Sequence, residues 1–485
     1  MSGAYLTFDS NRQERFARLS GDYNPVHLDP LVARRTQVGA PIVHGMHTVL
    51  RVIEAVAGVS LPHATGLKVQ FRKPIYVGEM ATVEIAERKG DSLRASAVVD
   101  GVETTVISIR FGNLLQPESV RPDIASQWTL VSPVTPMNLS LDEQLACKGA
   151  LPLERNSDSP HEMFPAAVGY LGEKRVSALM ACSRLVGMVV PGLHSIFTGC
   201  VLSLGAEIES RQELLHFAVL ASDARFRLVR IGIHGGGLTG VLESASRLPP
   251  ARQPDMSTVA RLVAESEFKN STALIVGGSR GLGEITAKMI AAGGGRVTIT
   301  YASGRSDAEA VANEICQSGG QCRIARYDVR KPAAQQVAAL DPHKLTHVYY
   351  FATPSIFRRS MPPFDPRRFE EFNQFYITGF VELVQAASRR SSNALTVFYP
   401  SSEAVVARPA DMTEYAMSKA AAEILCADLQ ERLANLTVIS KRLPRVATDQ
   451  TGSILAVGSA DCIDVMLPII REMHRSHESM SGVTQ

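Results

Sequence analysis

The chain has 485 residues, too many for a single hydrophobic core, and we expect about three domains. Its 50 lysines and arginines nearly balance 48 aspartates and glutamates, so the net charge of +2 indicates neither a nucleic-acid partner nor a membrane surface. The polar N-terminus and the lack of a long apolar run favour neither a secretion signal nor a membrane anchor. Seven cysteines without metal-like spacing predict reduced thiols, no metal site and a cytoplasmic location.

The first informative motif lies at residues 16–33 and places a carboxylate, Asp22, close to an imidazole, His27. The residues around Asp22 are turn formers, and proline keeps the residue before it out of the helical region, so we expect Asp22 in a loop. Pro25 suits the first turn of a helix, which carries His27 back beside that loop. A carboxylate and an imidazole that converge can move the protons needed to add or remove water.

This motif resembles the signature of the R-specific enoyl-CoA hydratases, the MaoC-like branch of the hotdog fold, at every specified position. The resemblance implies that Asp22 and His27 are the catalytic pair. The segment Ala40–Met46 resembles the family's second block, in which the backbone N–H of a glycine opening a buried helix polarises the thioester carbonyl. It implies that role for Gly45, whose missing side chain lets a carbonyl oxygen approach the positive end of the helix dipole. A hotdog thioesterase fits the motif less well.

One long helix and several strands follow the second block, which is the element order of a hotdog domain. We expect the helix at 43–56 and strands at 67–71, 92–99 and 103–110. The first domain is therefore predicted to be a MaoC-like dehydratase domain at residues 1–118. The stretch 116–141 is rich in proline and serine and is expected to cross into the next domain.

A weaker copy of this pattern follows. The segment Val190–Ser195 resembles Val43–Thr48, and strand-like runs come after it at 200–209, 214–221, 225–233 and 238–246. We predict a degenerate second hotdog domain at 119–250, giving an α+β double hotdog. It has no counterpart of the catalytic motif, and we expect it to complete the pocket of the first domain. His194 is expected to be a packed histidine near a helix start.

Prolines and charges at 251–270 predict a linker, after which the sequence changes character. A buried-strand run at Ala273–Val276, a glycine-rich turn and an alanine-rich helix at Ile285–Ala292 come in the order of a dinucleotide site. The glycines allow a tight turn and bring a pyrophosphate close to the helix N-terminus. From this turn we expect cofactor contacts at Gly277, Ser279, Arg280, Gly281, Leu282 and Gly283.

Tyr415 and Lys419 lie four residues apart in a helix-forming run, so they share one helix face, where the lysine can depress the pKa of the phenol. A predicted strand at Leu395–Tyr399 leads into Ser401 and Ser402. A serine, a tyrosine and a lysine can together bind a carbonyl, protonate it and hold the ribose of a cofactor.

With the glycine turn, this set resembles the short-chain dehydrogenase/reductase family, especially the 3-oxoacyl carrier-protein reductases, from residue 271 to about 450. We therefore expect an α/β domain with a Rossmann-type, doubly wound parallel sheet at 271–485. The resemblance implies that Ser402 orients the carbonyl, with Ser401 as the less favoured choice. It implies that Tyr415 is the general acid and that Lys419 tunes it and binds ribose. It also implies cofactor contacts at Asp328, Val329, Ala352 and Thr448.

The expected cofactor is NADPH. The second predicted strand, Arg296–Tyr301, ends without an acidic residue to receive a ribose 2′-hydroxyl, whereas Arg280 and Arg305 can meet a 2′-phosphate. The alternative for either arginine is a solvated position on the surface.

Three departures from the family pattern bear on the reductase site. Phe351–Pro354 stands in place of the usual Asn-Asn-Ala-Gly, Tyr376 in place of the active-site asparagine, and Pro444–Thr448 in place of the Pro-Gly motif. Two interpretations stay open: an exposed site for a large or carrier-bound substrate, or a reductase half that binds cofactor but turns over slowly.

The leading hypothesis is a two-step enzyme that reduces a 3-oxoacyl thioester and then dehydrates the (3R)-hydroxyacyl product to the trans-2-enoyl thioester. NADPH implies the biosynthetic direction, as in fatty-acid or polyketide assembly. We expect a substrate carried on acyl carrier protein or CoA and a homo-oligomer, either dimer or tetramer. One alternative is a hydratase and 3-hydroxyacyl dehydrogenase of acyl-CoA breakdown. The other is a dehydratase with a non-catalytic domain that binds NADP or docks a carrier protein.

Overall fold

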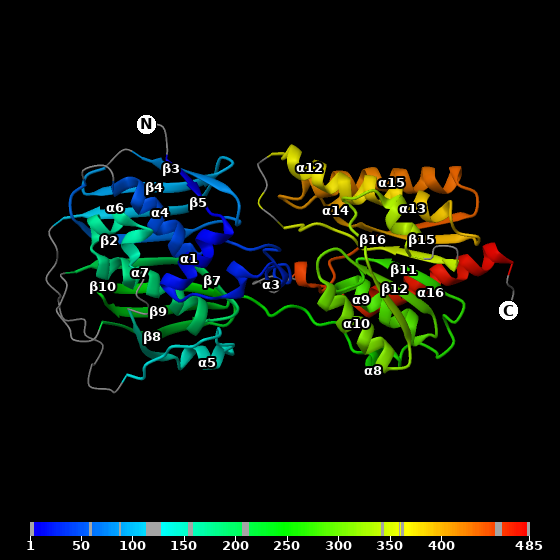
Figure 1. The fold of residues 1–485 in the computed structure, drawn as a ribbon, viewed down its shortest axis with the longest axis horizontal. Coiled ribbons are helices and arrows are strands. Elements are labelled where there is room, and N and C mark those ends of the chain that lie inside the picture. Colours follow the sequence, from blue (N-terminus) through cyan, green and yellow to red (C-terminus); the bar gives the residue numbers. More distant parts are fainter. Residues whose placement is uncertain are drawn as a thin grey trace. The chain divides into compact units, whose positions relative to one another are not determined.

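In the computed structural model the chain forms two compact units, with the boundary in the sequence between residues 249 and 250 (Figure 1). Each unit is described by itself. The structure describes residues 4–57, 61–86, 89–112, 128–153, 159–205, 213–340, 344–357, 359, 363–451 and 458–482. The predicted boundary between residues 118 and 119 and the end of the predicted strand 200–209 lie outside these ranges. Within them, no helix is both long and apolar enough to cross a membrane.

The first half of the first unit is a central helix followed by antiparallel strands. Its helices are α1 (Ser10–Ser20), α2 (Pro25–Leu28), α3 (Pro30–Ala33) and α4 (Gly45–Ala57). Its strands are β1 (Tyr5–Thr7), β2 (Ala64–Phe71), β3 (Met80–Ile85), β4 (Ser92–Val99) and β5 (Val102–Phe111). The predicted helix and the three predicted strands are confirmed with shifts of a few residues at their ends.

The second half of this unit repeats the order. Its helical elements are α5 (Leu141–Leu145), η1 (Pro160–Glu162), α6 (Pro165–Leu171) and α7 (Glu173–Arg184), and α7 continues as a π-helical turn, η2 (Leu185–Val189). Its strands are β6 (Lys148–Pro152), β7 (Ser195–Leu204), β8 (Leu214–Asp223), β9 (Leu228–Gly235) and β10 (Leu238–Ser246).

The two halves share one topology. The ten strands form a single sheet in the order β1-β3-β4-β5-β2-β7-β10-β9-β8-β6, so each strand of the first half has a counterpart at the mirrored position of the second. The halves join where β2 pairs antiparallel with β7. Helices α1, α4 and α7 lie over the sheet (Figure 1), and side chains of both halves, such as Val49, Ile53, Leu179 and Val186, pack in one core.

The sequence echo used to predict the second half does not mark equivalent positions. Val43 and His44 lead into α4, whereas Val190 follows the end of α7 and η2, and Ser195 begins β7. Pro191 and the left-handed Gly192 end the helical run there, because proline cannot continue a helix and glycine accepts a positive φ. The expectation that His194 lies near a helix start was wrong: it lies in the turn before a strand.

The second unit is a parallel sheet covered on both faces. Its strands are β11 (Thr272–Val276), β12 (Arg296–Tyr301), β13 (Gln321–Arg326), β14 (His347–Tyr350), β15 (Leu395–Ser402) and β16 (Leu436–Leu443), in the order β13-β12-β11-β14-β15-β16. Its helices include α8 (Met256–Val259), α9 (Gly281–Ala292), α10 (Arg305–Gln317), α11 (Ala333–Ala338), α12 (Pro366–Asn373), α13 (Gly379–Ser388), α14 (Ala404–Ala407), α15 (Thr413–Arg432) and α16 (Cys462–Ser481). The π-helical turn η4 (Gln374–Thr378) joins α12 to α13, and η5 (Asp449–Thr451) follows β16.

Two apolar cores, one on each face, hold this sheet. Side chains of α9, α10 and α16 form one core, and side chains of α11, α13 and α15 form the other, which is the predicted doubly wound architecture. Met256, Val259 and Phe268, from the segment expected as a linker, are buried in the first of these cores. The strand order reverses between β11 and β14, and ligands of open α/β sheets bind at that point, outside the carboxyl ends of the strands.

Candidate active sites

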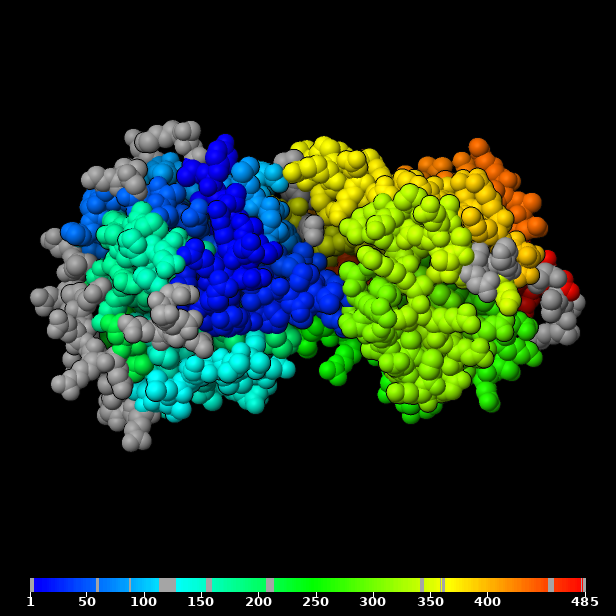
Figure 2. Space-filling model, viewed as in Figure 1, coloured from blue at the N-terminus to red at the C-terminus, as the bar shows by residue number. Residues whose placement is uncertain are grey.

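The turn after α1 directs Asp22 into the protein. Gly21 ends the helix in the left-handed conformation (φ 75°), and Asp22 behind it is only 1% exposed. Asn24 then caps α2, which Pro25 opens, as the turn residues predict. The N-terminal part of the chain that carries this motif is dark blue on the viewed face of Figure 2.

Asp22, His27 and His44 form one compact cluster. A carboxylate oxygen of Asp22 and a ring nitrogen of each histidine all lie within 4.8 Å of one another. His27 Nδ1 donates to the Ile42 carbonyl at 2.8 Å, so the Nε2 of a neutral His27 is free to accept a proton. Burial raises the pKa of Asp22 and lowers the pKa of His27, and the charge of each partly opposes the shift of the other. The two pKa values therefore shift toward each other, which favours Asp22 as an acid and His27 as a base.

The ligand atoms of these three residues lie close enough together to hold a metal ion, although the sequence spacing does not suggest a metal site. The His27 and His44 rings stack at 3.9 Å with an interplanar angle of 26°. Lone pairs of stacked imidazoles lie in nearly parallel planes and do not converge on one ion. The arrangement favours proton handling.

A buried hydrogen-bond chain fixes His44. Gln13 Oε1 accepts from the His44 backbone N–H at 3.2 Å and faces His44 Nδ1 at 2.8 Å, while the Gln13 amide nitrogen lies 2.9 Å from His47 Nδ1. His44 Nε2 lies 3.0 Å from the backbone oxygen of Asp22. Burial lowers the pKa of His47 to about 3, so His47 is neutral. The chain ties the Asp22 loop to α1 and α4.

The second half of the unit closes the pocket around Asp22. The Ser183 hydroxyl on α7 donates to Asp22 Oδ2 at 2.7 Å. The Asn24 amide donates to the carbonyls of Gly187 at 2.8 Å and Gly192 at 3.1 Å. Gly187 packs so closely that a Cβ there would overlap the Asp22 carboxylate. The half without a catalytic motif therefore orients the acid of the other half.

Gly45 opens α4 directly after His44, so its N–H belongs to the first helical turn, which has no intrahelical acceptor. A Cβ at Gly45 would lie 2.8 Å from the Phe71 ring, so a side chain does not fit. This geometry suits the expected approach of a carbonyl oxygen to a backbone donor.

In the second unit, the glycine turn between β11 and α9 is built for close backbone approach. Gly277 has φ 81°, and a Cβ there would lie 3.0 Å from the backbone carbon of Phe351. A Cβ at Gly283 would overlap the Gly277 carbonyl oxygen. Thr448 covers Gly281, whose Cβ would lie 3.6 Å from the threonine methyl. The cradle, together with the N-terminus of the 12-residue α9, fits a dinucleotide pyrophosphate.

The other expected cofactor residues flank this cradle. Arg305 opens α10 just after β12, pairs with Glu309 at 2.8 Å and remains 71% exposed, whereas Arg280 lies 3.5 Å from Asp449. Arg330 holds both Asp328 carboxylate oxygens, at 2.9 and 3.0 Å. Ser279 and Val329 are buried, and Leu282 and Ala352 are partly buried.

The serine, tyrosine and lysine converge at the carboxyl end of β15. The Ser401 hydroxyl donates to Glu423 at 2.5 Å, and Ser401 is buried, which favours Ser402 as the carbonyl-binding serine. Burial raises the pKa of Tyr415, and a hydrogen bond with the Ser402 side chain opposes that rise. Lys419 Nζ donates to the Pro400 carbonyl at 2.6 Å, and burial lowers the pKa of Lys419 to about 7.

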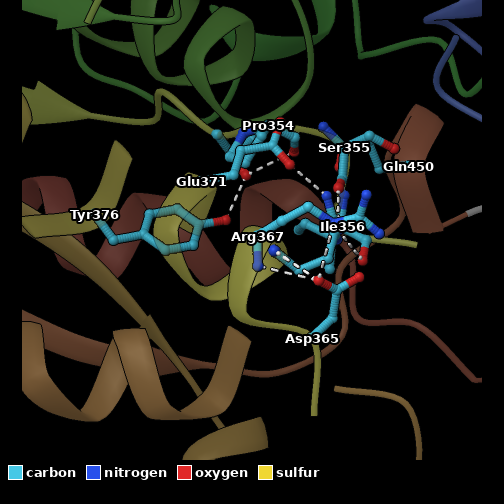
Figure 3. A network of polar contacts seen from close by, with 10 residues as sticks. Pro354, Ser355, Ile356, Asp365, Arg367, Glu371, Tyr376 and Gln450 are labelled. Carbon is cyan, nitrogen blue, oxygen red and sulfur yellow. Dashed lines mark hydrogen bonds and ion pairs between the residues drawn. The ribbon is translucent and has the colours of Figure 1, made fainter. Parts of the chain in front are cut away.

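The loop that replaces Asn-Asn-Ala-Gly is anchored from several sides. Tyr376 shares a 2.5 Å hydrogen bond with Thr353, and the Gln450 side chain accepts from the Ile356 backbone N–H at 3.2 Å. The buried Arg368 donates to the Ser355 carbonyl at 2.8 Å. Figure 3 shows Tyr376 and Gln450 approaching this loop from different elements. Two of the departures from the family pattern, the loop and Tyr376, therefore contact each other.

Comparison with known proteins gives two family matches. Residues 4–108 match the MaoC like domain, and residues 271–458 match the short chain dehydrogenase family. The chain joins a MaoC-like domain to a short-chain dehydrogenase domain. The family matches confirm the predicted hotdog and Rossmann-type folds. The MaoC-like match ends within β5, so it does not include the second half of the first unit.

Individual relatives cover parts of the chain. An (R)-specific enoyl-CoA hydratase of Aeromonas caviae is 39% identical over 74 residues, which are 14% of this chain and 54% of that protein. The peroxisomal hydratase-dehydrogenase-epimerase of Saccharomyces cerevisiae is 30% identical over 95 residues, 20% of this chain and 10% of that enzyme. A short chain dehydrogenase of Burkholderia cenocepacia, solved in complex with NADP, is 24% identical, with a TM-score of 0.38 over 43% of this chain and 91% of that one. The chain thus spans about half, or less, of the length of these curated relatives.

Sequence reasoning missed several residues of both domains. In the first unit these are Gln13, His44, Ser183 and Gly187, and in the short-chain dehydrogenase domain they are Thr353 and Arg368. His44 carried a signal, because it stands next to Gly45 in the second family block. Ser183 ends the helix α7 and Gly187 lies in the apolar turn η2, and neither belongs to a local motif.

Proposed function

We propose that the chain is a bifunctional enzyme that acts on acyl thioesters. Its short-chain dehydrogenase domain reduces a 3-oxoacyl thioester with NADPH, and its MaoC-like domain dehydrates the (3R)-hydroxyacyl product to the trans-2-enoyl thioester. The observation that carries the proposal is the presence in one chain of the Asp22–His27 pair and the Ser402–Tyr415–Lys419 set. Their chemistries share one intermediate, and a tether raises its local concentration.

For dehydration, the directions of the two pKa shifts support His27 as the base and Asp22 as the acid. The neutral His27 accepts the C2 proton at Nε2 as the C2–H bond breaks. The protonated Asp22 gives its proton to the C3 hydroxyl, which leaves as water while the C2–C3 double bond forms. The Gly45 N–H stabilises negative charge on the thioester oxygen.

For reduction, the cradle between β11 and α9 would hold the pyrophosphate, and bound NADPH supplies a hydride to the carbonyl carbon. The Ser402 hydroxyl binds the carbonyl oxygen, and Tyr415 gives it a proton. A charged Lys419 stabilises the phenolate that remains and holds the ribose. The exposed Arg305 at the end of β12 supports a 2′-phosphate and hence NADPH.

The expected setting follows from this chemistry. NADPH supports the reductive direction, as in fatty-acid or polyketide assembly. The proposed substrate is carried by acyl carrier protein or CoA, which present the same pantetheine arm, and the proposed state is a cytoplasmic homodimer or homotetramer.

Two other functions have an observation in their favour. The name of the yeast relative, a hydratase-dehydrogenase-epimerase, favours hydration followed by oxidation in acyl-CoA breakdown. Tight binding of NADH in preference to NADPH would support that direction. The altered loop at Phe351–Pro354 and Tyr376 favour a non-catalytic domain that binds NADP or docks a carrier. An unchanged rate of ketoreduction in Tyr415→Phe would support this second alternative.

The deciding experiment incubates the whole chain with a 3-oxoacyl thioester and NADPH and follows product mass. We expect the 3-oxoacyl signal to give way to the enoyl thioester. Asp22→Asn should stop at the 3-hydroxyacyl thioester with NADPH oxidation intact. Tyr415→Phe should leave the 3-oxoacyl thioester unreduced and still dehydrate a supplied (3R)-hydroxyacyl thioester. Loss of both activities from either substitution in a folded protein contradicts the two-site proposal.

A further inference from the structure

Lys419 is a cation surrounded by aromatic rings. Its side-chain nitrogen lies 3.9 Å from the centroid of the Tyr376 ring and 4.7 Å from that of Tyr399. The Tyr415 ring is farther away, at 5.9 Å. Lys419 is only 5% exposed, and among the described residues its ammonium donates to the Pro400 carbonyl. The ring faces therefore supply much of the environment of this ammonium group.

The nearby carboxylate is engaged elsewhere. Glu423, one turn along α15, accepts from Arg442 at 2.7 and 2.8 Å and from Ser401 at 2.5 Å. Among the described residues, no ion pair joins it to Lys419. The titratable groups that face Lys419 are Tyr376 from η4, Tyr399 from β15, and Tyr415, Glu423 and Cys426 from α15. The shortest of these contacts is with the Tyr376 ring.

The Tyr376 ring is held rigidly. The Thr353 hydroxyl donates to the Pro354 carbonyl at 3.0 Å, so in the 2.5 Å contact the Tyr376 hydroxyl is the donor and Thr353 the acceptor. The ring stacks on Phe372 with centroids 5.6 Å apart and an interplanar angle of 8°. Tyr376 is 1% exposed. Figure 3 shows its hydroxyl directed toward the loop at Pro354. The Lys419 ammonium lies over the face of this Tyr376 ring.

We propose that Tyr376 is a positioning residue of the reductase site, whose ring face holds the Lys419 ammonium in place beside Tyr415. It stands where the resembled family has an asparagine, so this chain secures its lysine with an aromatic ring. The role in catalysis rests on the proposed function, whereas the contact between the ring and the lysine does not.

The ring offsets the effect of burial on the lysine. Burial favours the neutral amine, and a desolvated contact with a ring face favours the ammonium by enough to raise a lysine pKa by about one unit. A neutral Lys419 no longer stabilises the Tyr415 phenolate, so loss of the ring weakens proton donation at the upper end of the pH range.

The experiment titrates Lys419 directly, in the full chain without cofactor. Lysine labelled with ¹³C and ¹⁵N gives a side-chain signal for Lys419, assigned by its disappearance in Lys419→Arg. We expect Tyr376→Leu to lower the pKa of Lys419 by about one unit. Tyr376→Phe keeps the ring and should titrate like the parent chain. Thr353→Val should do the same, because it removes the acceptor of the tyrosine hydroxyl and the donor to the Pro354 carbonyl but leaves the ring and its stacking on Phe372 in place.

The controls separate the ring contact from general loosening. Phe380→Leu removes another buried ring of the same core, from α13, which contacts Tyr350 and Tyr399. It should leave the Lys419 titration unchanged. If Tyr376→Leu fails to fold, Tyr376→Met fills more of the volume and tests the same loss of a ring. An unchanged pKa in a folded Leu or Met variant, or an equal fall in Tyr376→Phe, overturns the proposal.

A second readout distinguishes this proposal from the proposed function. In an active reductase, the fall of kcat/KM at high pH should move about one unit lower in Tyr376→Leu and stay in place in Tyr376→Phe. If the Lys419 pKa falls in Tyr376→Leu but the parent chain shows no ketoreduction, the contact between the ring and the lysine is supported and the reductase function is contradicted. If the parent chain reduces the substrate but the Lys419 pKa is the same in Tyr376→Leu, only the positioning role is contradicted.

Discussion

The Ser183 hydroxyl donates a 2.7 Å hydrogen bond to Asp22 Oδ2 across 161 residues of sequence. Ser183 comes from the half of the first unit that carries no catalytic motif. The bond favours the charged carboxylate and so opposes the rise that burial gives the pKa of Asp22. A residue of the second half therefore both orients the Asp22 carboxyl and opposes the rise in its pKa.

Ser183→Ala should slow dehydration about tenfold or more, because the Ser183 hydroxyl stabilises the carboxylate charge that develops as Asp22 gives up its proton, and a hydrogen bond to a charged group is worth about 1.5–3 kcal/mol. Without this donor the pKa of Asp22 rises further, so the limb of the pH–rate profile that reports loss of the Asp22 proton should move to higher pH. Steady-state dehydration of a (3R)-hydroxyacyl thioester across pH measures both effects. Ser244→Ala, a buried serine of the same half that donates to the Ile196 carbonyl, should change neither.

Gly187→Ala tests the packing against the same carboxylate. The added Cβ overlaps Asp22, so the carboxylate must move away from His27, and a displacement of about 1 Å can cost 100-fold in rate. We expect dehydration to fall by about that factor while ketoreduction persists. Gly169→Ala, on α6, is the matched control because nothing lies within 4 Å of its Cβ. Equal rates for the two variants would show that Gly187 does not shape the site.

These contacts show where prediction from the sequence ends. The loop at Asp22 and the helix opened by Pro25 depend on neighbouring turn-forming residues, so the sequence predicts them. Ser183 and Gly187 acquire their roles only when α7 packs beside α1, a contact between distant segments that no local pattern records. The same holds for Thr353, which meets Tyr376 through the tertiary fold.

The fold divides in the same way. Alternating apolar residues predict strands such as β4 and β10, because a half-buried strand has a fixed period. The similarity between Val190–Ser195 and Val43–Thr48 predicts the second half, but the two segments are not structurally equivalent. The first of them follows the end of a helix, whereas the second leads into the helix that begins at Gly45. The mirrored strand order of the two halves depends on pairing between strands and is absent from any single segment.

Gly283→Ala should weaken cofactor binding and raise the Kd for NADPH at least tenfold. The methyl group overlaps the Gly277 carbonyl, so the turn must open and the N-terminus of α9 moves away from the pyrophosphate. Fluorescence titration with NADPH measures this, and dehydration by the other unit should be unaffected. Gly458→Ala, with nothing within 4 Å of its Cβ, should bind like the parent. Unchanged affinity in Gly283→Ala would place the cofactor elsewhere.

Three buried histidines should make the second unit sensitive to acid. His347 stacks on His474 at 4.6 Å and lies 4.7 Å from the His477 ring, and all three are at most 9% exposed. Burial lowers the pKa of His474 to about 4 and that of His347 well below its usual range. Glu267 beside His474 and Glu478 beside His477 only partly offset this.

The direction in which the stability of this unit changes with pH follows from proton binding. Below pH ~6.5 the unfolded chain binds protons that the folded unit excludes, so stability is fully present above that pH and declines as pH falls. Between pH 6.5 and 5, His474, with its pKa of about 4, should cost on the order of 2 kcal/mol of stability. Calorimetry at both pH values should show a lower unfolding temperature for the second unit in acid and a smaller drop in His474→Phe. His161→Phe, an exposed position in the first unit, should show the full drop. An identical drop in His474→Phe would mean that this cluster does not set the acid limit.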